Sequence, residues 1–286
     1  MIGADEKDFI RGGFKADVRS DGRRCLESRP LALSLGDLQQ CSGSARCTLG
    51  SNDVIVGVKA ELGSPLPDTP DCGGVQITVE CSPCTGPELQ GRSGETLAFD
   101  LARKLEKTLS AGPSGRGSPL DLRALCILSG RTCWVLCIDA LVLSMDGSLI
   151  DALGVAIRAA LQNTRIPLVE VGATEDADEE PELELDDDPA NAKHVDVSRL
   201  PVILTVCQAD DAFVLDATAR EEQAADQACH IAVDPSGAIC SMFMGSKAAI
   251  TPFALQEMMG LAQKRAPLIL QAVHKFVASA AVSMES

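Results

Sequence analysis

The chain has 286 residues and a mass of 30.0 kDa, which allows one or two domains with a large buried core. Apolar residues make up 45% of it, so a wholly disordered protein is excluded. The formal charge is -16, but ten acidic residues lie between Glu175 and Asp188, and the remaining 31 acidic and 25 basic residues give the rest of the chain a charge of only -6. This mildly acidic charge disfavours tight binding of nucleic acid by the chain alone, which would need a broad basic face, although it allows a local basic groove.

Strands followed by a helix are predicted for the first half of the chain. A short helix over residues 4–14 ends at Gly12 and Gly13, and a turn-rich segment follows. Alternating apolar residues then predict strands of a mainly antiparallel sheet at 31–36, 44–49, 53–61 and 73–81. Leucines at every fourth position predict a helix over 94–109, and composition predicts a flexible loop at 111–119. Strands at 121–128 and 133–144 and a helix at 149–163 complete this half.

The second half repeats this order after an acidic tract. Residues 172–194 contain almost no aromatic side chains, so we expect this tract to bury too little surface to order itself. Strands at 200–207 and 212–217, a hairpin around residues 234–237 and a terminal helix over 251–278 follow. The repeated order predicts an α+β fold of duplicated sheet and helix layers.

Four segments result from this division of the chain. Residues 1–28 are an N-terminal helix and arm, 29–167 a first domain, 168–198 an acidic linker, and 199–286 a second domain with a C-terminal helix. The N-terminus lacks the apolar core of a secretory signal, and the apolar run 134–145 is broken by Asp139 and is too short to span a membrane. We therefore expect a soluble intracellular protein with no membrane partner.

Cysteine usage predicts no metal or cofactor. The 12 cysteines lie mostly within apolar strand patterns, so we interpret them as reduced thiols. Cys81 and Cys84 have the spacing of half a zinc site, but there is no second such pair, and the three histidines are scattered singly.

Two acidic residues stand where the pattern changes from strand to helix. Asp146, before Gly147 and Ser148, suits a turn and the positive end of a helix dipole, but it could also bind a metal. Asp139 lies inside a predicted buried strand, where an unpaired carboxylate is costly, so a structural hydrogen bond or ion pair with a neighbouring strand or subunit is expected for it.

Several motifs resemble those of RNase PH-like proteins. They are VRSDGR at 18–23, GSARCTLGSNDVIVGVKAELG at 43–63, PELQGR at 87–92, CWVLCIDALVL at 133–143, DGSLIDA at 146–152 with AALQNTRIP at 159–167, and DDDP at 186–189 with LPVILTVC at 200–207. The motifs occur in the same order as in the family, and the resemblance covers about residues 8–275. The resemblance implies an RNase PH-like fold, of the ribosomal protein S5 domain 2-like type, and a place in a six-membered ring of similar subunits around an RNA channel.

The resemblance also implies a reaction, phosphorolysis of RNA, and this sequence departs from the residues that active members use for it. Active members use inorganic phosphate to release nucleoside diphosphates from RNA 3' ends, with carboxylates that place a divalent metal and donors that hold phosphate. Their Asp-x-Asp-x-Leu-Gln-Ala-Asp-Gly-Gly-Thr-Arg pattern aligns with DALVLSMDGSLI here. Asp139 and Asp146 match the first and third acids, Leu141 replaces the middle acid, and Leu149 and Ile150 replace the Thr-Arg pair. Loss of those donors disfavours phosphate binding.

Four arginines are candidate RNA contacts. Arg92 matches a position that contacts RNA or phosphate in the family, and Arg131 lies where members often place a basic group. Arg116 in the flexible loop and Arg123 at a strand start complete the set. A few phosphate contacts repeated around a ring suffice to thread a single strand.

The resemblance and its departures together imply a non-catalytic structural subunit of the RNA exosome core ring that supports 3'-to-5' RNA processing and degradation, including rRNA maturation and mRNA turnover. Its expected partners are other RNase PH-like subunits, OB/KH-type cap subunits, a separate 3'-to-5' exonuclease and single-stranded RNA, and its expected location is the nucleus, including the nucleolus, and the cytoplasm. The alternative is a phosphorolytic exoribonuclease that uses Asp139 and Asp146 with magnesium.

Overall fold

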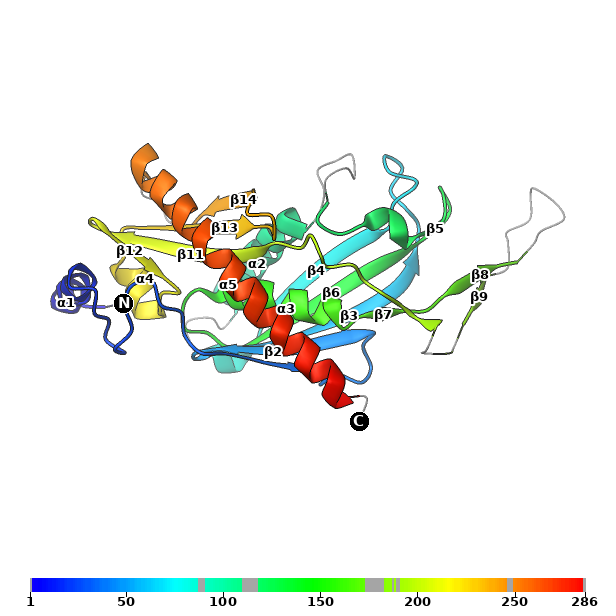
Figure 1. Cartoon of the computed structure of the whole chain (residues 1–286), viewed down its shortest axis with the longest axis horizontal. Helices are drawn as coiled ribbons and strands as arrows, with labels where there is room; N and C mark the ends of the chain where they lie inside the picture. Colours follow the sequence, from blue (N-terminus) through cyan, green and yellow to red (C-terminus); the bar gives the residue numbers. More distant parts are fainter. Residues whose placement is uncertain are drawn as a thin grey trace.

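The computed structural model in Figure 1 describes residues 2–86, 91–109, 118–172, 183–186, 188, 191–245 and 249–284. Its first sheet contains β1 (Leu31–Leu35), β2 (Gly43–Leu49), β3 (Asn52–Gly63), β4 (Gly74–Cys81), β5 (Cys126–Leu128) and β6 (Thr132–Ser144). The strand order is β1-β2-β3-β6-β4, with β5 paired to β6. Only the β4–β6 pair in this sheet is parallel. The chain makes this crossover through helix α2 (Arg92–Leu109) and the short 3-10 helix η3 (Leu122–Leu125).

The second half forms a four-stranded antiparallel sheet in the order β12-β11-β13-β14. These strands are β11 (Val202–Ala209), β12 (Ala212–Leu215), β13 (Gln227–Val233) and β14 (Ile239–Met244). Two small ribbons connect the halves: β7 (Arg165–Ile166) pairs with β10 (Lys193–His194), and β8 (Val169–Val171) pairs with β9 (Leu183–Leu185). The β8–β9 arm extends away from the body (Figure 1).

Helix α3 (Leu149–Gln162) is shared by the two halves. Almost every residue of this helix is buried, because it contacts β2 and β3 on one side and β11 on the other. Gly154 of this helix faces the Ile203 side chain of β11, and a Cβ atom at this position would lie 3.5 Å from it, in ordinary van der Waals contact. One hydrophobic cluster therefore runs through both sheets and α3.

The long C-terminal helix α5 (Pro252–Met284) crosses the face of the molecule diagonally in Figure 1. It buries Ala254, Met258, Ala262 and Ala266, which are spaced by four residues and so lie on one helical face. No helix of the described residues is both long and apolar enough to cross a membrane.

The N-terminal helix α1 (Ala4–Lys15) packs against the second half of the chain. Phe14 joins a small cluster with Cys207 and Val214. The Arg11 Nε donates to the Ala224 carbonyl at 3.0 Å, and the Lys15 Nζ lies 2.9 Å from the Asp210 carboxylate. These contacts join the N-terminal helix to residues about 200 positions further along the chain.

Three predicted elements differ from the structure. The strand expected at 121–128 begins as η3, where the Asp121 side chain accepts from the Arg123 N–H, and only 126–128 are extended. The strand expected at 212–217 ends at Leu215, and a short helix, α4 (Ala219–Ala224), follows. The acidic tract was expected to be unordered, but residues 183–185 and 193–194 form β9 and β10, because backbone pairing requires no apolar side chains.

Candidate functional site

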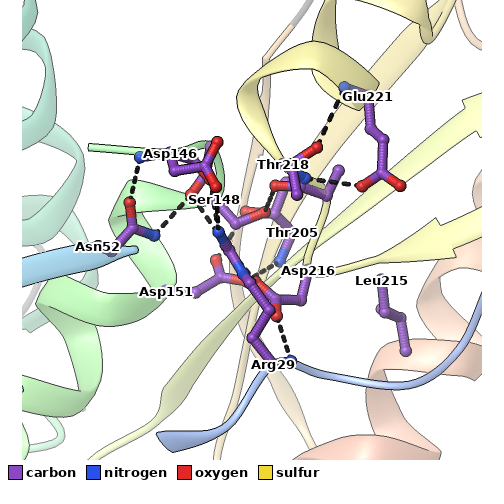
Figure 2. A network of polar contacts seen from close by, with 12 residues as sticks. Arg29, Asn52, Asp146, Ser148, Asp151, Thr205, Leu215, Asp216, Thr218 and Glu221 are labelled. Atoms are coloured by element: carbon purple, nitrogen blue, oxygen red, sulfur yellow. Dashed lines mark hydrogen bonds and ion pairs between the residues drawn. The ribbon is translucent and has the colours of Figure 1, made fainter. Parts of the chain in front are cut away.

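The turn between β6 and α3 is built by residues from both halves of the chain (Figure 2). The buried Asn52 accepts from the Asp146 N–H at 2.5 Å and donates to the Gly147 carbonyl at 2.7 Å. Gly147 has φ +70°, and a Cβ atom there would lie 2.4 Å from the Ala217 carbonyl oxygen. The Asp146 carboxylate accepts from the Ala219 N–H at the start of α4, at 3.1 Å. Asp146 thus holds a turn and caps a helix of the second half.

Arg29 joins this turn to the second sheet and was missed by the sequence analysis. Its guanidinium donates to the carbonyls of Asp146 at 2.6 Å and Gly147 at 3.1 Å and binds the Asp216 carboxylate at 2.6 Å (Figure 2). Arg29 and Asp216 have side chains only 5% exposed. Burial opposes the charge of Arg29, yet the hydrogen bonds and charge of Asp216 raise its pKa above the ordinary value.

A protein carboxylate occupies the start of α3. The Ser148 N–H donates to the Glu222 Oε1 at 2.7 Å, and Ser148 itself is in the left-handed region with φ 48°. Burial raises the pKa of Glu222, although this hydrogen bond and Arg29 oppose the rise. The next residues, Leu149 and Ile150, are 6% and 2% exposed and supply no side-chain donor. An external anion would therefore have to displace Glu222 to reach this helix start.

Behind the turn lies a buried chain of polar groups. The Asp151 carboxyl accepts from the Thr205 N–H at 2.8 Å and lies 2.6 Å from the Thr205 hydroxyl, which is 2.8 Å from His230 Nδ1. Burial raises the pKa of Asp151 well above its usual value. Burial, and then Lys104, lowers the pKa of His230 to about 4. These groups join α3, β11 and β13.

Asp139 and Asp146 are too far apart to share one metal ion. The Cα partner of Asp139 on β3 is Gly57, and Asn52, which binds Asp146, lies five residues earlier, so the acids are roughly 17 Å apart. Asp139 is exposed with Leu141 on the sheet face opposite the buried Ile138 and Ala140. The expectation that Asp139 is buried was wrong, since from Leu136 to Val142 the even positions of β6 are the buried ones. A pairing of this exposed carboxylate with a neighbouring subunit stays a prediction.

The candidate RNA-binding arginines do not form one cluster. Arg92 is exposed at the start of α2, which follows the end of β4, whereas Arg131 directly precedes β6, whose start pairs with the start of the parallel β4, so about the length of β4 separates them. Arg123 forms an exposed ion pair with Asp71 at 3.3 Å, and Arg131 lies in the exposed turn between β5 and β6. Arg116 lies outside the described residues.

No group of three or more His, Cys, Asp or Glu side chains in the described ranges is arranged to hold a metal ion. Four other residues of this network could not be found from the sequence, because each acts on a residue distant in the chain: Asn52, Asp151, Asp216 and Glu222. Thr218 and Glu221 did carry a signal. They form a capping box at the start of α4, with the Thr218 side chain accepting from the Glu221 N–H and Glu221 accepting from the Thr218 N–H.

Family models agree with this two-part architecture. The model of domain 1 of the 3' exoribonuclease family, RNase PH, matches residues 27–167, and the model of domain 2 matches residues 199–265. The chain belongs to this RNase PH family. The predicted α+β RNase PH-like fold and the predicted family membership are confirmed.

Similar proteins are exosome components. The chain is 29% identical to the putative exosome complex exonuclease RRP42 of Dictyostelium discoideum, with 96% of this chain and 97% of the relative covered. It is 30% identical to the exosome complex component Rrp42 of Methanocella arvoryzae, with 94% and 95% covered. A solved chain of the Archaeoglobus fulgidus exosome with RNA bound to the active site superposes with a TM-score of 0.77 at 25% identity, covering 93% of this chain and 97% of that one.

Proposed function

We propose that this chain is an Rrp42-type subunit of the RNA exosome core ring and supports 3'-to-5' RNA processing and degradation. Its end-to-end match to Rrp42 components and to exosome core chains supports this role. The partners are other RNase PH-like subunits in a six-membered ring, OB/KH-type cap subunits, a separate 3'-to-5' exonuclease and single-stranded RNA.

We further propose that the subunit is not itself catalytic. The observation that carries this proposal is the Glu222 carboxylate on the Ser148 N–H, which fills the anion position at the start of α3. Leu149 and Ile150 add no donors there, so neither charge nor hydrogen bonds remain to hold a phosphate. The alternative, phosphorolysis by Asp139 and Asp146 with magnesium, has no geometric support, because the two carboxylates face different parts of the molecule.

Release of nucleoside diphosphates tests this proposal. The full-length chain, alone and assembled with its RNase PH-like partners, is incubated with RNA, inorganic phosphate and magnesium. We expect no release from the chain alone and an unchanged rate from assemblies that carry Glu222→Gln or Asp146→Asn in this subunit. Native mass spectrometry of each assembly is the control. Release by the isolated chain, or its loss in an intact variant assembly, would contradict a non-catalytic role.

For location, we propose the nucleus, including the nucleolus, together with the cytoplasm. The proposal follows from a role in both rRNA maturation and mRNA turnover. Fractionation of cells that express the tagged full-length chain tests it, and confinement to one compartment would contradict it.

A further inference from the structure

Two cysteines lie directly opposite each other in the β5–β6 hairpin, outside the site described above. Cys126 of β5 and Cys133 of β6 are Cα partners in the antiparallel register. Residues that are opposite in such a pair have Cα atoms about 4.5–5.5 Å apart and side chains on the same face of the sheet. A disulfide needs Cα atoms about 4.4–6.8 Å apart, so the backbone already meets this requirement.

Cys126 is the cross-strand side-chain neighbour of Cys133. On the other side of β6, Cys133 is opposite Gly63 of β3, which has no side chain. Burial, and then the charge that a Cys126 thiolate carries, raises the pKa of Cys133 above its usual value. A charge has such an effect only at short range, which agrees with the register in placing the two thiols near each other.

The hairpin can adjust to a covalent bond without losing its register. The Cβ atoms of a disulfide are about 3.8 Å apart, closer than in an ordinary cross-strand pair. The register shifts between Cys126 and Leu128, and β5 has only three residues, so this short strand can move towards β6. The turn is fixed by the Arg131 N–H, which donates to the Leu128 carbonyl at 3.0 Å, and by Gly130, whose φ is +75°.

The two thiols differ in their access to solvent. Cys126 is partly exposed, and its Sγ makes only a long contact, at 4.0 Å, with the Pro70 carbonyl oxygen. Cys133 is 1% exposed. A dissolved disulfide can therefore react with Cys126 of this pair, whereas Cys133 reacts from within the protein, once Cys126 has been modified.

We propose that Cys126 and Cys133 form a reversible disulfide by exchange with glutathione disulfide. The Cys126 thiolate attacks one sulfur of glutathione disulfide, which forms a mixed disulfide and releases one glutathione. The Cys133 thiolate then attacks the Cys126 sulfur, which forms the protein disulfide and releases the second glutathione. The two cysteine protons end on the released glutathione thiolates, so the protein is oxidised and glutathione disulfide is reduced.

The bond would tie a marginal strand to the centre of the first sheet. All the cysteines are free thiols in this structure, and β5 is too short to be stable by itself. Closing the 126–133 segment removes open conformations of the hairpin, including the turn that carries Arg131. Amide exchange of Cys126–Leu128 should become about tenfold slower on oxidation and return to its original rate with dithiothreitol.

Trypsin can locate the bond, because it cleaves after Arg123, Arg131 and Arg158 and so leaves the two cysteines in separate peptides, 124–131 and 132–158. The full-length chain is treated with glutathione disulfide, its remaining thiols are alkylated, and it is digested without reductant. We expect mass spectrometry to find these two peptides joined, and dithiothreitol to separate them.

Three variants test the assignment and the order of steps. Cys133→Ser should stop at the mixed disulfide, with one glutathione left on Cys126. Cys126→Ser should give neither this adduct nor the bond. Cys137→Ser is the matched control, because Cys137 is the next residue on the same face of β6 and is also partly exposed. It should form the bond as the original chain does. Thermal unfolding verifies that each variant is folded.

Trp134 provides a second readout, since it adjoins Cys133 and the chain has one tryptophan and no tyrosine. A disulfide quenches the fluorescence of a neighbouring indole. Oxidation should therefore lower the Trp134 fluorescence of the original chain, and dithiothreitol should restore it. Cys126→Ser should show no such change. An equal decrease in Cys126→Ser would overturn the proposal, because the signal would then come from another thiol.

The peptide map can also reject the proposed pair. A bond from Cys126 to Cys72 or Cys137 would show that the register does not bring Cys133 to it. Glutathione that stays on Cys126 in the original chain, with no joined peptides, would show that Cys133 cannot complete the exchange. Either result would contradict the proposal.

Discussion

At the scale of single residues, Arg29 and Asp216 decide how the two halves meet. Their ion pair is almost fully buried, and the Asp216 carboxylate also accepts from the Arg29 N–H at 2.6 Å. A buried charge that loses its partner is strongly destabilising, because it keeps the cost of leaving water without the compensating attraction.

Asp216→Asn should therefore lower the free energy of unfolding by about 3 kcal/mol. Asp210→Asn is the matched control, since both residues have positive φ, 49° and 53°. Asp210 has a side chain 39% exposed, and its pairs with Lys15 and Arg11 should contribute less than about 1 kcal/mol. Urea unfolding measures both. Equal losses would show that Arg29 does not depend on Asp216.

His230 makes the free energy of unfolding depend on pH in the acidic range. Its pKa in the fold is about 4, against 6.5 for an ordinary histidine, so the unfolded chain takes up the proton first as the pH falls. The contribution of neutral His230 is fully present above pH 6.5 and is lost as the pH falls towards about 4.

His230→Gln should consequently lose less stability than the original chain between pH 7 and the region near pH 4. Glutamine keeps a polar contact for Thr205 but does not titrate, while the carboxylates elsewhere affect both proteins equally. Urea unfolding at both pH values gives the comparison. Parallel losses in the two proteins would mean that His230 titrates normally.

At the scale of elements, a short helix or strand is stable only where neighbouring elements pack against it. Helix α4 has six residues, yet it has a capping box, the Asp146 carboxylate at its start and a packed α1 beside it. The β8–β9 arm has three residues a strand and extends from the body (Figure 1). A short isolated ribbon is marginal in water.

Amide hydrogen exchange should distinguish these cases. Peptides covering Val169–Val171 and Leu183–Leu185 should exchange about a hundredfold faster than those covering Val202–Ala209, because β11 is paired on both sides and buried. Mass spectrometry of the full-length chain follows the exchange. Protection of the arm equal to that of β11 would contradict its marginal stability.

At the scale of the whole molecule, the two matched family domains share one core. Helix α3 belongs to the first domain in sequence but packs against β11 of the second, and α5 returns from the second to contact β1. Neither sheet can lose these helices without exposing its own apolar face.

We therefore expect one unfolding transition for the full-length chain. Trp134 fluorescence reports the first sheet, while far-ultraviolet circular dichroism reports all helices and strands. The two signals should coincide along a urea titration. Two separated midpoints would show that the halves unfold independently.

Periodicity in the sequence was sufficient for most elements. The leucines of α2 and the alanine-rich, largely apolar sequence of α3 indicate helices, because such patterns fit burial of one helical face or of nearly all faces. The Thr218 and Glu221 capping box is a local signal for α4, but the expectations drawn from the sequence did not include this helix. The face of β6 was not readable, because apolar residues stand at both odd and even positions, so only the packing of α3 shows that Asp139 and Leu141 are exposed.

The amino-acid sequence by itself determined the order of strands and helices, the family, and the absence of phosphate donors at Leu149 and Ile150. These depend on local periodicity and on side-chain chemistry at each position. Only the tertiary structure decided that Glu222 fills the start of α3 and that Arg29 binds Asp216. Each of these contacts joins residues tens to hundreds of positions apart, and such pairing follows from how the two sheets close on α3 rather than from any local pattern.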